Sequence, residues 1–110
     1  MEKPIVKRLT LEVFPRGQQS DRYDWINIGA GPEFVGKMRC RMGVNVLTIY
    51  SIMIFTGFRG SGFGRQTIQM LKQQFGVIVA DRVRHSAVGF WSGMGFRDRG
   101  DGNWEYTKSS

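Results

Sequence analysis

The sequence predicts an α/β (α+β) domain with an antiparallel N-terminal meander, a strand–helix–strand unit with parallel strands, a short helix and a terminal strand or hairpin. Apolar and polar residues alternate in several short segments over residues 5–55, which is typical of half-buried strands. Helical periodicity over residues 63–75 is followed by a uniformly apolar run at residues 77–80, as in a strand covered on both faces. A chain of 110 residues is long enough to form one hydrophobic core, so we expect a single domain over residues 1–110.

In the first part of the chain, residues Ile5 to Phe14 alternate and are expected to form a first strand. Residues 15–21 form a polar loop, too short for a helix pair, and Tyr23 to Ile28 form a second short strand. Gly29 to Pro32 should then turn the chain. The first two strands are therefore expected to be joined directly and to lie antiparallel.

The next two strands are expected to form a hairpin, with Phe34 to Met42 turning at Gly43–Asn45 into Val46–Phe55. The alternation predicts a half-buried third strand with a basic outer face. One face would carry Phe34, Gly36, Met38, Cys40 and Met42, and the other Val35, Lys37, Arg39 and Arg41.

A helix is expected from about Phe63 to Phe75, with Gly76 as the residue that follows its C-cap. The strand Val77–Ala80 would complete a right-handed crossover, because parallel strands joined by a helix have that hand. The carboxyl ends of the two parallel strands, and Asp81, would then lie at the edge of the sheet where the preceding loop lies.

The last part of the chain predicts a short helix and a hairpin. Ser86 is a suitable N-cap for a helix over residues 87–94, and Gly95 followed by Phe96 indicates a Schellman ending. Residues 96–99 and 104–107 bracket a glycine-rich turn and are expected to pair as late strands.

Composition excludes several classes of protein. No apolar run reaches the length of a membrane span, and the N-terminus has no signal-peptide pattern. The single cysteine, Cys40, has no partner for an internal disulfide, and one histidine leaves no ligand set for zinc, so no metal is expected. We interpret Cys40 as a small buried apolar residue and expect a reducing, cytoplasmic setting.

The chain is strongly basic, with a net charge of +7 and an isoelectric point near 10.2. Such a charge attracts anions, which leaves nucleic acid, an acidic protein or a polyphosphate cofactor as partners. A solvated basic surface would give the same value, so the charge alone does not decide among them.

The loop between the fourth strand and the first helix carries Gly57, Gly60, Gly62 and Gly64. Glycines let a backbone approach phosphate oxygens, and the N–H groups at a helix start have no intrahelical partner. Gly64 is followed by Arg65-Gln rather than Lys-Ser/Thr, and no three glycines have the dinucleotide spacing, so neither the P-loop nor the dinucleotide motif is present. An anion-binding loop and a tight turn without a ligand both stay open.

Two segments carry a resemblance to a known family. Arg59-x-x-Gly62-x-Gly64 resembles the acyl-CoA pyrophosphate loop of the GNAT superfamily of N-acetyltransferases, and the segment from Ala87 to Phe96 resembles the family's later helix-and-strand motif. They occur in the family's order, and the resemblance covers roughly residues 33 to 108. The chain looks like a minimal member that lacks most of the N-terminal helix pair, with no match in the first 30 residues.

The resemblance implies a GNAT-like mixed sheet whose two parallel strands splay to admit acetyl-CoA. Backbone groups of the fourth strand would hold pantetheine, a bulge would free an N–H for the thioester carbonyl, and the glycine loop would hold the pyrophosphate. The residues that it assigns to the cofactor are Ile52, Met53, Ile54, Arg59, Gly60, Ser61, Gly62, Phe63, Gly64, Arg65, Phe90 and Trp91.

The chain departs from the family pattern at two positions. Trp91 stands where the family often has the tyrosine that protonates the leaving thiolate, and an indole N–H cannot serve as that acid. Ser86 or water would have to do so. Arg84 stands where the family motif begins with asparagine, and Trp91 could simply be a core residue.

The resemblance also implies a general base for the acceptor amine. Asp81 is the best-placed carboxylate at the end of its strand, although a surface ion pair with Arg82 or Arg84 would account for it equally well. His85 has a suitable ordinary pKa, and Glu33 is a third candidate at a strand start.

The expected function is direct transfer of an acetyl group from acetyl-CoA to a primary amine, on a protein lysine or N-terminus. The basic face Lys37, Arg39 and Arg41 argues against a polyamine acceptor. The alternatives are an inactive CoA-binding or protein-interaction domain of this fold, or a basic nucleic-acid-binding module in which residues such as Trp25, Trp104 and Tyr106 stack bases. Edge strands in so short a chain also make a homodimer an expectation.

Overall fold

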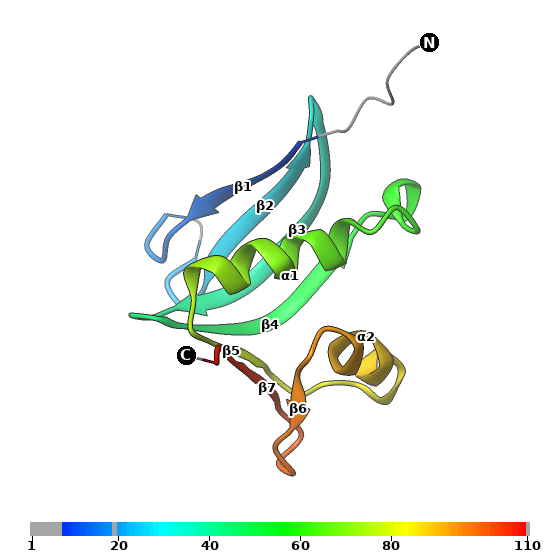
Figure 1. Ribbon diagram of the computed structural model, residues 1–110. Helices are drawn as coiled ribbons and strands as arrows, with labels where there is room; N and C mark the ends of the chain where they lie inside the picture. The colour runs from blue at the N-terminus through cyan, green and yellow to red at the C-terminus, as the bar shows by residue number, and fades with distance from the viewer. Residues whose placement is uncertain (1–7, 19, 110) are drawn as a thin grey trace.

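The computed structural model describes residues 8–18 and 20–109. Within them a seven-stranded mixed sheet has the order β1-β2-β3-β4-β5-β7-β6, and helices α1 and α2 contribute to one core with it (Figure 1). The elements are β1 Leu9–Phe14, β2 Asp24–Ala30, β3 Glu33–Met42, β4 Val46–Ile54, the 3₁₀ turn η1 Thr56–Phe58, α1 Phe63–Gln74, β5 Val77–Ala80, the 3₁₀ turn η2 His85–Ala87, α2 Val88–Gly93, β6 Arg97–Asp98 and β7 Trp104–Thr107.

The N-terminal half is the expected antiparallel meander, in which β1 to β4 pair in chain order. Residues 5–7 of the expected first strand lie outside the described residues. The second strand is longer than expected: Gly29 and Ala30, predicted in the turn, still pair with β1 and β3, so the turn shrinks to Gly31 and Pro32. Burial of Ile26, Ile28 and Ala30 explains why the strand continues.

The prediction of which β3 residues share a face is wrong at its start. Phe34 is 50% exposed whereas Val35 is buried, the reverse of the expected alternation. The cause is a β-bulge: Ile28 pairs with Gly36 and Gly29 pairs with Phe34, which leaves Val35 as an extra residue. From Met38 onward the expected faces are confirmed.

A second bulge lies in β4, where Ser51 pairs with Arg39 and Ile49 pairs with Cys40, leaving Tyr50 between them. It shifts the phase of the strand by one residue, so that Leu47 and Ile49 face the core before it and Ile52 after it. The bulge that the family resemblance implied for this strand is therefore present, at Tyr50.

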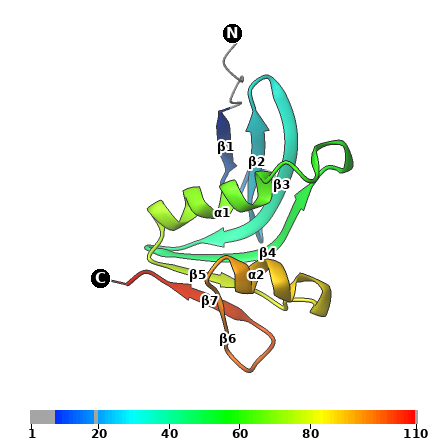
Figure 2. The same cartoon turned by 45° about the vertical axis from the view of Figure 1, so that its right-hand side comes forward.

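Strand β5 pairs in parallel with β4, and the right-handed crossover through α1 is in place. The pairing covers the whole of β5, Val77–Ala80 against Val46–Ile49, and ends just before the bulge. Beyond that point β4 continues toward the glycine loop, whereas the chain after β5 turns away toward α2 (Figures 1 and 2). The expected splay is therefore confirmed, and the bulge marks where it begins.

Gly76 does not act as the left-handed residue after the helix, because the residues with positive φ do not include it. Its N–H donates to the Asn45 side-chain oxygen at 2.8 Å, and a Cβ at Gly76 would lie 2.6 Å from the Asn45 amide nitrogen. A side chain at this position would displace the Asn45 amide from its hydrogen bond, a tertiary contact that the helix pattern could not indicate.

Of the two predictions made for the termini of α2, the one for its start is wrong and the one for its end is confirmed. Ser86 does not cap the helix: the N-cap is Ala87, without a side-chain hydrogen bond, because the η2 turn precedes the helix. The Schellman ending is confirmed, since Gly95 has φ +85°, its N–H donates to Ser92, and the Phe96 N–H donates to Trp91. The late hairpin is also confirmed, as β6 paired with β7.

In the described part of the chain, no helix is long and apolar enough to cross a bilayer.

The core lies between one face of the sheet and the helices α1 and α2 that pack on it. The central residues come from every layer: Ile26, Met38, Cys40, Leu47, Ile49, Ile68, Leu71, Ile78, Ala80, Trp91, Met94 and Phe96.

Cys40 lies in this core, as predicted, and its thiol contacts the Asp24 backbone oxygen at 3.7 Å. Burial, reinforced by the Asp24 carboxylate, raises the pKa of the Cys40 thiol to about 12. An unfolded thiol has a pKa of about 8.5, so we expect iodoacetamide at about pH 8 to spare the native protein and to modify it in urea. The stability that comes from the protonated thiol should be complete below about pH 8.5 and fall as the pH rises toward 12. Mass spectrometry of the alkylated protein checks this, and rapid labelling of the native protein would contradict it.

Candidate functional site

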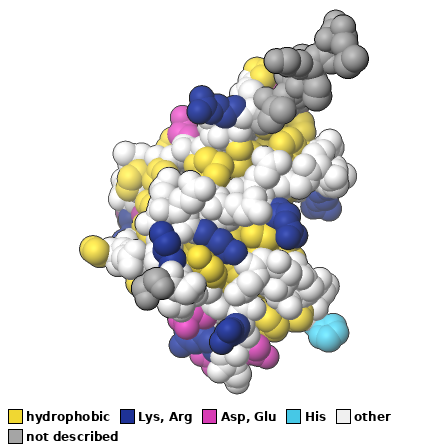
Figure 3. Space-filling model, in the orientation of Figure 1, with side chains coloured by type: hydrophobic (Ala, Val, Ile, Leu, Met, Phe, Trp, Pro, Cys, Tyr) yellow, Lys and Arg dark blue, Asp and Glu magenta, His cyan; other side chains and the backbone are white. Residues whose placement is uncertain are grey.

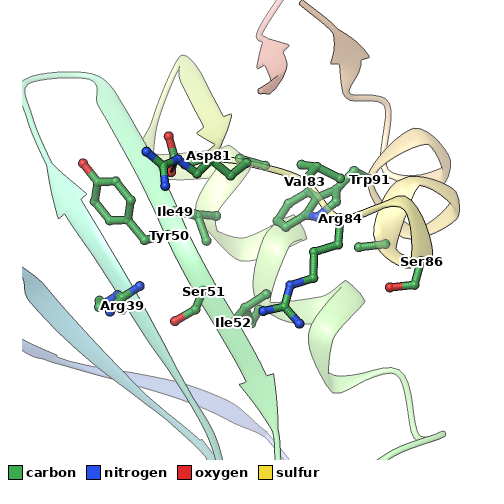
Figure 4. A pocket seen from close by; sticks show the side chains of 13 residues that line it. Arg39, Ile49, Tyr50, Ser51, Ile52, Asp81, Val83, Arg84, Ser86 and Trp91 are labelled. Carbon is green, nitrogen blue, oxygen red and sulfur yellow. Dashed lines mark ion pairs between the residues drawn. The ribbon is translucent and has the colours of Figure 1, made fainter. Parts of the chain in front are cut away.

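A pocket of about 410 Å³ lies where β4 and β5 part, and Figure 4 shows it from close by. Its floor comes from the bulged segment of β4, and its wall from the end of β5, the loop after it and α2. The lining residues are Arg39, Ile49, Tyr50, Ser51, Ile52, Ala80, Asp81, Arg82, Val83, Arg84, Ser86, Ala87 and Trp91.

Asp81 is held at the end of β5, where its N–H donates to the Ile49 oxygen at 2.9 Å, the last contact before the strands separate. Its carboxylate faces the Arg82 Nε at 4.0 Å, and the two side chains are 28% and 93% exposed. The ion pair considered from the sequence is therefore present. Because Arg82 is so exposed, the pair is weak and leaves the Asp81 carboxylate accessible from the pocket.

The late hairpin fixes the loop that follows Asp81. Arg82 has φ +48°, which is costly for a residue with a side chain, and its N–H donates to the Asn103 side chain at 2.8 Å. The next N–H, from Val83, donates to the Gly102 oxygen at 2.9 Å. These two bonds hold the loop, and with it Arg84, against the pocket.

The other expected acid–base residues separate into two groups. Ser86 lines the pocket with Asp81, from η2 (Figure 4). His85 is exposed and is not among the lining residues, and Figure 3 shows the imidazole projecting from the surface. Glu33 lines a different pocket at the start of β3. Asp81 and Ser86 therefore line the same pocket, although they lie well apart in Figure 4, whereas His85 and Glu33 lie outside it.

Sequence reasoning gave no role in the site to several polar lining residues, among them Arg39, Tyr50 and Ser51. Tyr50 reaches the pocket because of the bulge, and its ring meets Tyr23 edge to face at 5.1 Å. The sequence carried no usable signal for the bulge, because Val46 and Met53 are apolar as well and hide the change of phase between Ile49 and Ile52.

The glycine loop forms a second pocket, of about 320 Å³, at the start of α1. Gly60 and Gly62 have φ of +85° and +81°, a conformation that side chains disfavour, so the two glycines are required by the shape of the loop. The lining residues are Ile54, Phe58, Arg59, Gly60, Gly62, Phe63, Gly64, Arg65 and Phe90. Ser61 does not line it, although it belongs to the same loop.

The two pockets share their framework. Ile52 lines the first and Ile54 the second, so two residues of β4 bridge the pockets, and Arg59 Nε ties the loop to the Ile54 oxygen at 2.9 Å. On the opposite wall, α2 supplies Trp91 to the first pocket and Phe90 to the second, with their rings edge to face at 5.0 Å. The two pockets therefore lie along the same two elements, β4 and α2, with Arg59 and Arg65 at one pocket and Asp81 at the other.

Trp91 combines the two interpretations drawn from the sequence. Its ring is almost fully buried and packs against Phe96 at 4.8 Å, so it is a core residue. It also lines the first pocket. The Met53 side chain is half exposed, and Met53 lines neither pocket.

No family model matches the chain, and no curated protein matches it in sequence. Solved structures do match. The N-acetyltransferase YlbP of Bacillus subtilis, in complex with coenzyme A, is similar with a TM-score of 0.60 and 19% identity over 76% of this chain, which spans 66% of the YlbP chain. YhhK of Escherichia coli, bound to coenzyme A, gives a TM-score of 0.71 and 13% identity over 91% of this chain and 98% of its own. A GNAT family acetyltransferase of Elizabethkingia anophelis, with acetyl-CoA bound, gives 0.65 and 11% over 90% and 97%.

Proposed function

The chain has the fold of the GNAT acetyltransferases, and from this premise we propose that it is an acyl-CoA-dependent N-acetyltransferase that moves an acetyl group from acetyl-CoA directly to a primary amine. The observation that carries the proposal is the parting of β4 from the chain after β5 at the Tyr50 bulge, with one pocket lined by Ile52 and another by Ile54 along the same strand. A tight turn without a ligand accounts for the glycine loop but not for this opening.

In the proposed complex the glycine loop would bind the pyrophosphate. Gly60 and Gly62 adopt positive φ, which turns successive backbone N–H groups toward one side, and α1 begins immediately afterwards. Arg59 and Arg65 add charge at the same pocket. Pantetheine would then run along Ile52–Ile54 as an added strand and deliver the thioester to the pocket at the bulge.

At the bulge, a backbone N–H released from the ladder would polarise the thioester carbonyl. The neutral amine attacks the carbonyl carbon, the carbon–sulfur bond breaks, and the CoA thiolate leaves. The proton lost by the amine passes to Asp81, directly or through water, and the thiolate takes a proton from a pocket hydroxyl or water. Catalysis rests mainly on holding the two reactants together.

Two hydroxyl groups of the pocket are candidates for protonating the thiolate. Trp91 cannot do so, but Ser86 and Tyr50 both line the same pocket. The Tyr50 backbone forms the bulge, and its phenol extends from there away from Ile52 (Figure 4). Tyr50 thus offers a phenol from β4, whereas the family motif implied one on the helix that carries Trp91.

The direct test is acetyl transfer to a panel of short peptides with a free N-terminal amine and one lysine. Release of free CoA and the added mass of one acetyl group on the peptide are measured together. Transfer supports the proposal, and the fragment that gains mass identifies the amine. Acetyl-CoA binding without transfer would favour an inactive CoA-binding domain of this fold, and no binding by the folded protein would refute both.

We expect Asp81→Asn to lower kcat by roughly 10- to 100-fold with little change in the affinity for acetyl-CoA, because the amide cannot accept the amine proton. The loss should be largest at neutral pH and shrink as the pH rises and the amine deprotonates unaided. Asp21→Asn is the matched control, since Asp21 is exposed and lines none of the pockets described above. Equal pH profiles for the wild type and Asp81→Asn would remove Asp81 as the base.

A further inference from the structure

The mouth of the first pocket is cationic. Arg39 from β3 and Arg82 and Arg84 from the loop after β5 line it, against one carboxylate, Asp81. That carboxylate is 4.0 Å from Arg82. Among the described residues, neither Arg39 nor Arg84 has an ion pair with a carboxylate. Figure 4 shows the Arg84 side chain extending into the pocket beside Ile52.

We propose that the acceptor is a primary amine flanked by acidic residues in an extended peptide segment of another protein. This inference rests on the function proposed above and specifies its substrate class. A protonated amine alone is repelled by three arginines, whereas carboxylates beside the amine reverse the sign of the interaction. The same positive field favours the neutral form of the bound amine, which is the form that attacks.

The cationic surface continues from the pocket along β3. Lys37, Arg39 and Arg41 stand at alternate positions of the strand, and no helix of the described chain packs on their side of the sheet. Alternate side chains of an extended peptide have this same spacing, about 6.6–6.8 Å. Arg39 belongs to both the strand and the pocket, so a peptide lying along β3 reaches the transfer site with its acidic side chains facing the three cations.

The arrangement of the aromatic rings favours acidic side chains over nucleic acid. Single-stranded nucleic acid binds by stacking bases on exposed aromatic faces. Here the Arg39 guanidinium lies 4.7 Å from the centre of the Tyr23 ring, and the Lys37 ammonium lies 5.6 Å from the Trp25 ring. Tyr50 also contacts Tyr23 through an edge. The faces of the Tyr23 and Trp25 rings are therefore covered by the protein's own cationic side chains, and this surface offers a ligand positive charge.

The test uses three peptides of equal length, each with a free N-terminal amine and one lysine, flanked by glutamate, alanine or arginine. We expect kcat/KM to be at least tenfold higher for the glutamate peptide than for the alanine peptide, and lowest for the arginine peptide. Arg84→Glu should erase or invert this order, and the preference should weaken as salt rises. Arg97→Glu is the control, with the same charge change on an exposed β6 residue outside the pocket.

Fluorescence anisotropy with labelled forms of the same peptides, and with a single-stranded RNA of matched length, gives a readout that needs no catalysis. Tighter binding of the glutamate peptide, lost in Arg84→Glu, supports the inference even if no acetyl transfer occurs, in which case only the proposed function fails. Transfer to all three peptides at equal kcat/KM overturns the inference and leaves the function standing. RNA binding tighter than the glutamate peptide also overturns it.

Discussion

Replacing Gly64 with glutamate should abolish acetyl-CoA binding while leaving the protein at least as stable as the wild type. A Cβ at Gly64 would lie 3.6 Å from the Phe90 ring and 3.7 Å from Ile54, which are ordinary contacts, and both neighbours line the loop pocket. The carboxylate would therefore enter the space assigned to the pyrophosphate. Repulsion between like charges there is worth several kcal/mol, so we expect the dissociation constant to rise at least about 100-fold.

The stability of this variant should move in the opposite direction. Gly64 is the second residue of α1, where a glutamate interacts favourably with the helix dipole, and replacing a helical glycine gains about 0.5–1 kcal/mol. Calorimetric titration with acetyl-CoA and thermal unfolding measure the two effects separately. A stable Gly64→Glu protein that still binds with wild-type affinity would show that the loop is not the pyrophosphate site.

Gly89→Glu provides a matched control for the charge change. Gly89 is also the second residue of its helix, α2, and a Cβ there meets nothing within 4 Å. Gly89 lines neither pocket of the site, so the dissociation constant of this variant for acetyl-CoA should stay within a few-fold of the wild-type value.

Gly62→Trp would block the loop pocket sterically. Because Gly62 has φ of +81°, a side chain there also strains the backbone.

The glycine loop and the order of the elements could be predicted because their signals are local. Glycines in a tight turn, such as Gly60 and Gly62, indicate positive φ. The spacing of Phe63, Thr67 and Leu71 depends only on the periodicity of α1 itself. Gly95 ends α2 for the same kind of reason. Each feature needs only its own neighbours in the sequence.

The bulges at Val35 and Tyr50 could not be placed in this way, since a bulge is a relation between two strands. The consequence was not confined to the fold. Without the bulge, Tyr50 could not be assigned to the pocket, and Arg39 was seen only as part of an outer basic face. The assignment of Tyr50 and Arg39 to the site therefore depends on strand register.

Asp24 is a further residue whose role depends on distant parts of the chain. It is 2% exposed, and its two carboxylate oxygens accept the Arg16 N–H at 2.8 Å and the Met42 N–H at 2.7 Å. Arg16 Nε lies 3.4 Å from the same carboxylate and its guanidinium donates to the Met42 oxygen. One side chain thus joins the loop after β1 to the end of β3, which nothing in the local sequence around position 24 indicates.

Asp24→Ala should lower the free energy of unfolding by about 2–4 kcal/mol, because it leaves two backbone N–H groups without an acceptor and Arg16 without its partner. For a domain near 100 residues this corresponds to a fall in Tm of roughly 10–25 °C. Urea unfolding measures the change, and Asp21→Ala, at an exposed carboxylate in the same loop, should stay within about 0.5 kcal/mol of the wild type. The free energy of unfolding of Asp24→Asn should lie between those of the wild type and Asp24→Ala, since the amide oxygen can still accept one of the two N–H groups. If Asp24→Ala proved as stable as the wild type, the β1 loop and the end of β3 would have to be held together by other contacts, and the buried carboxylate would need a different explanation.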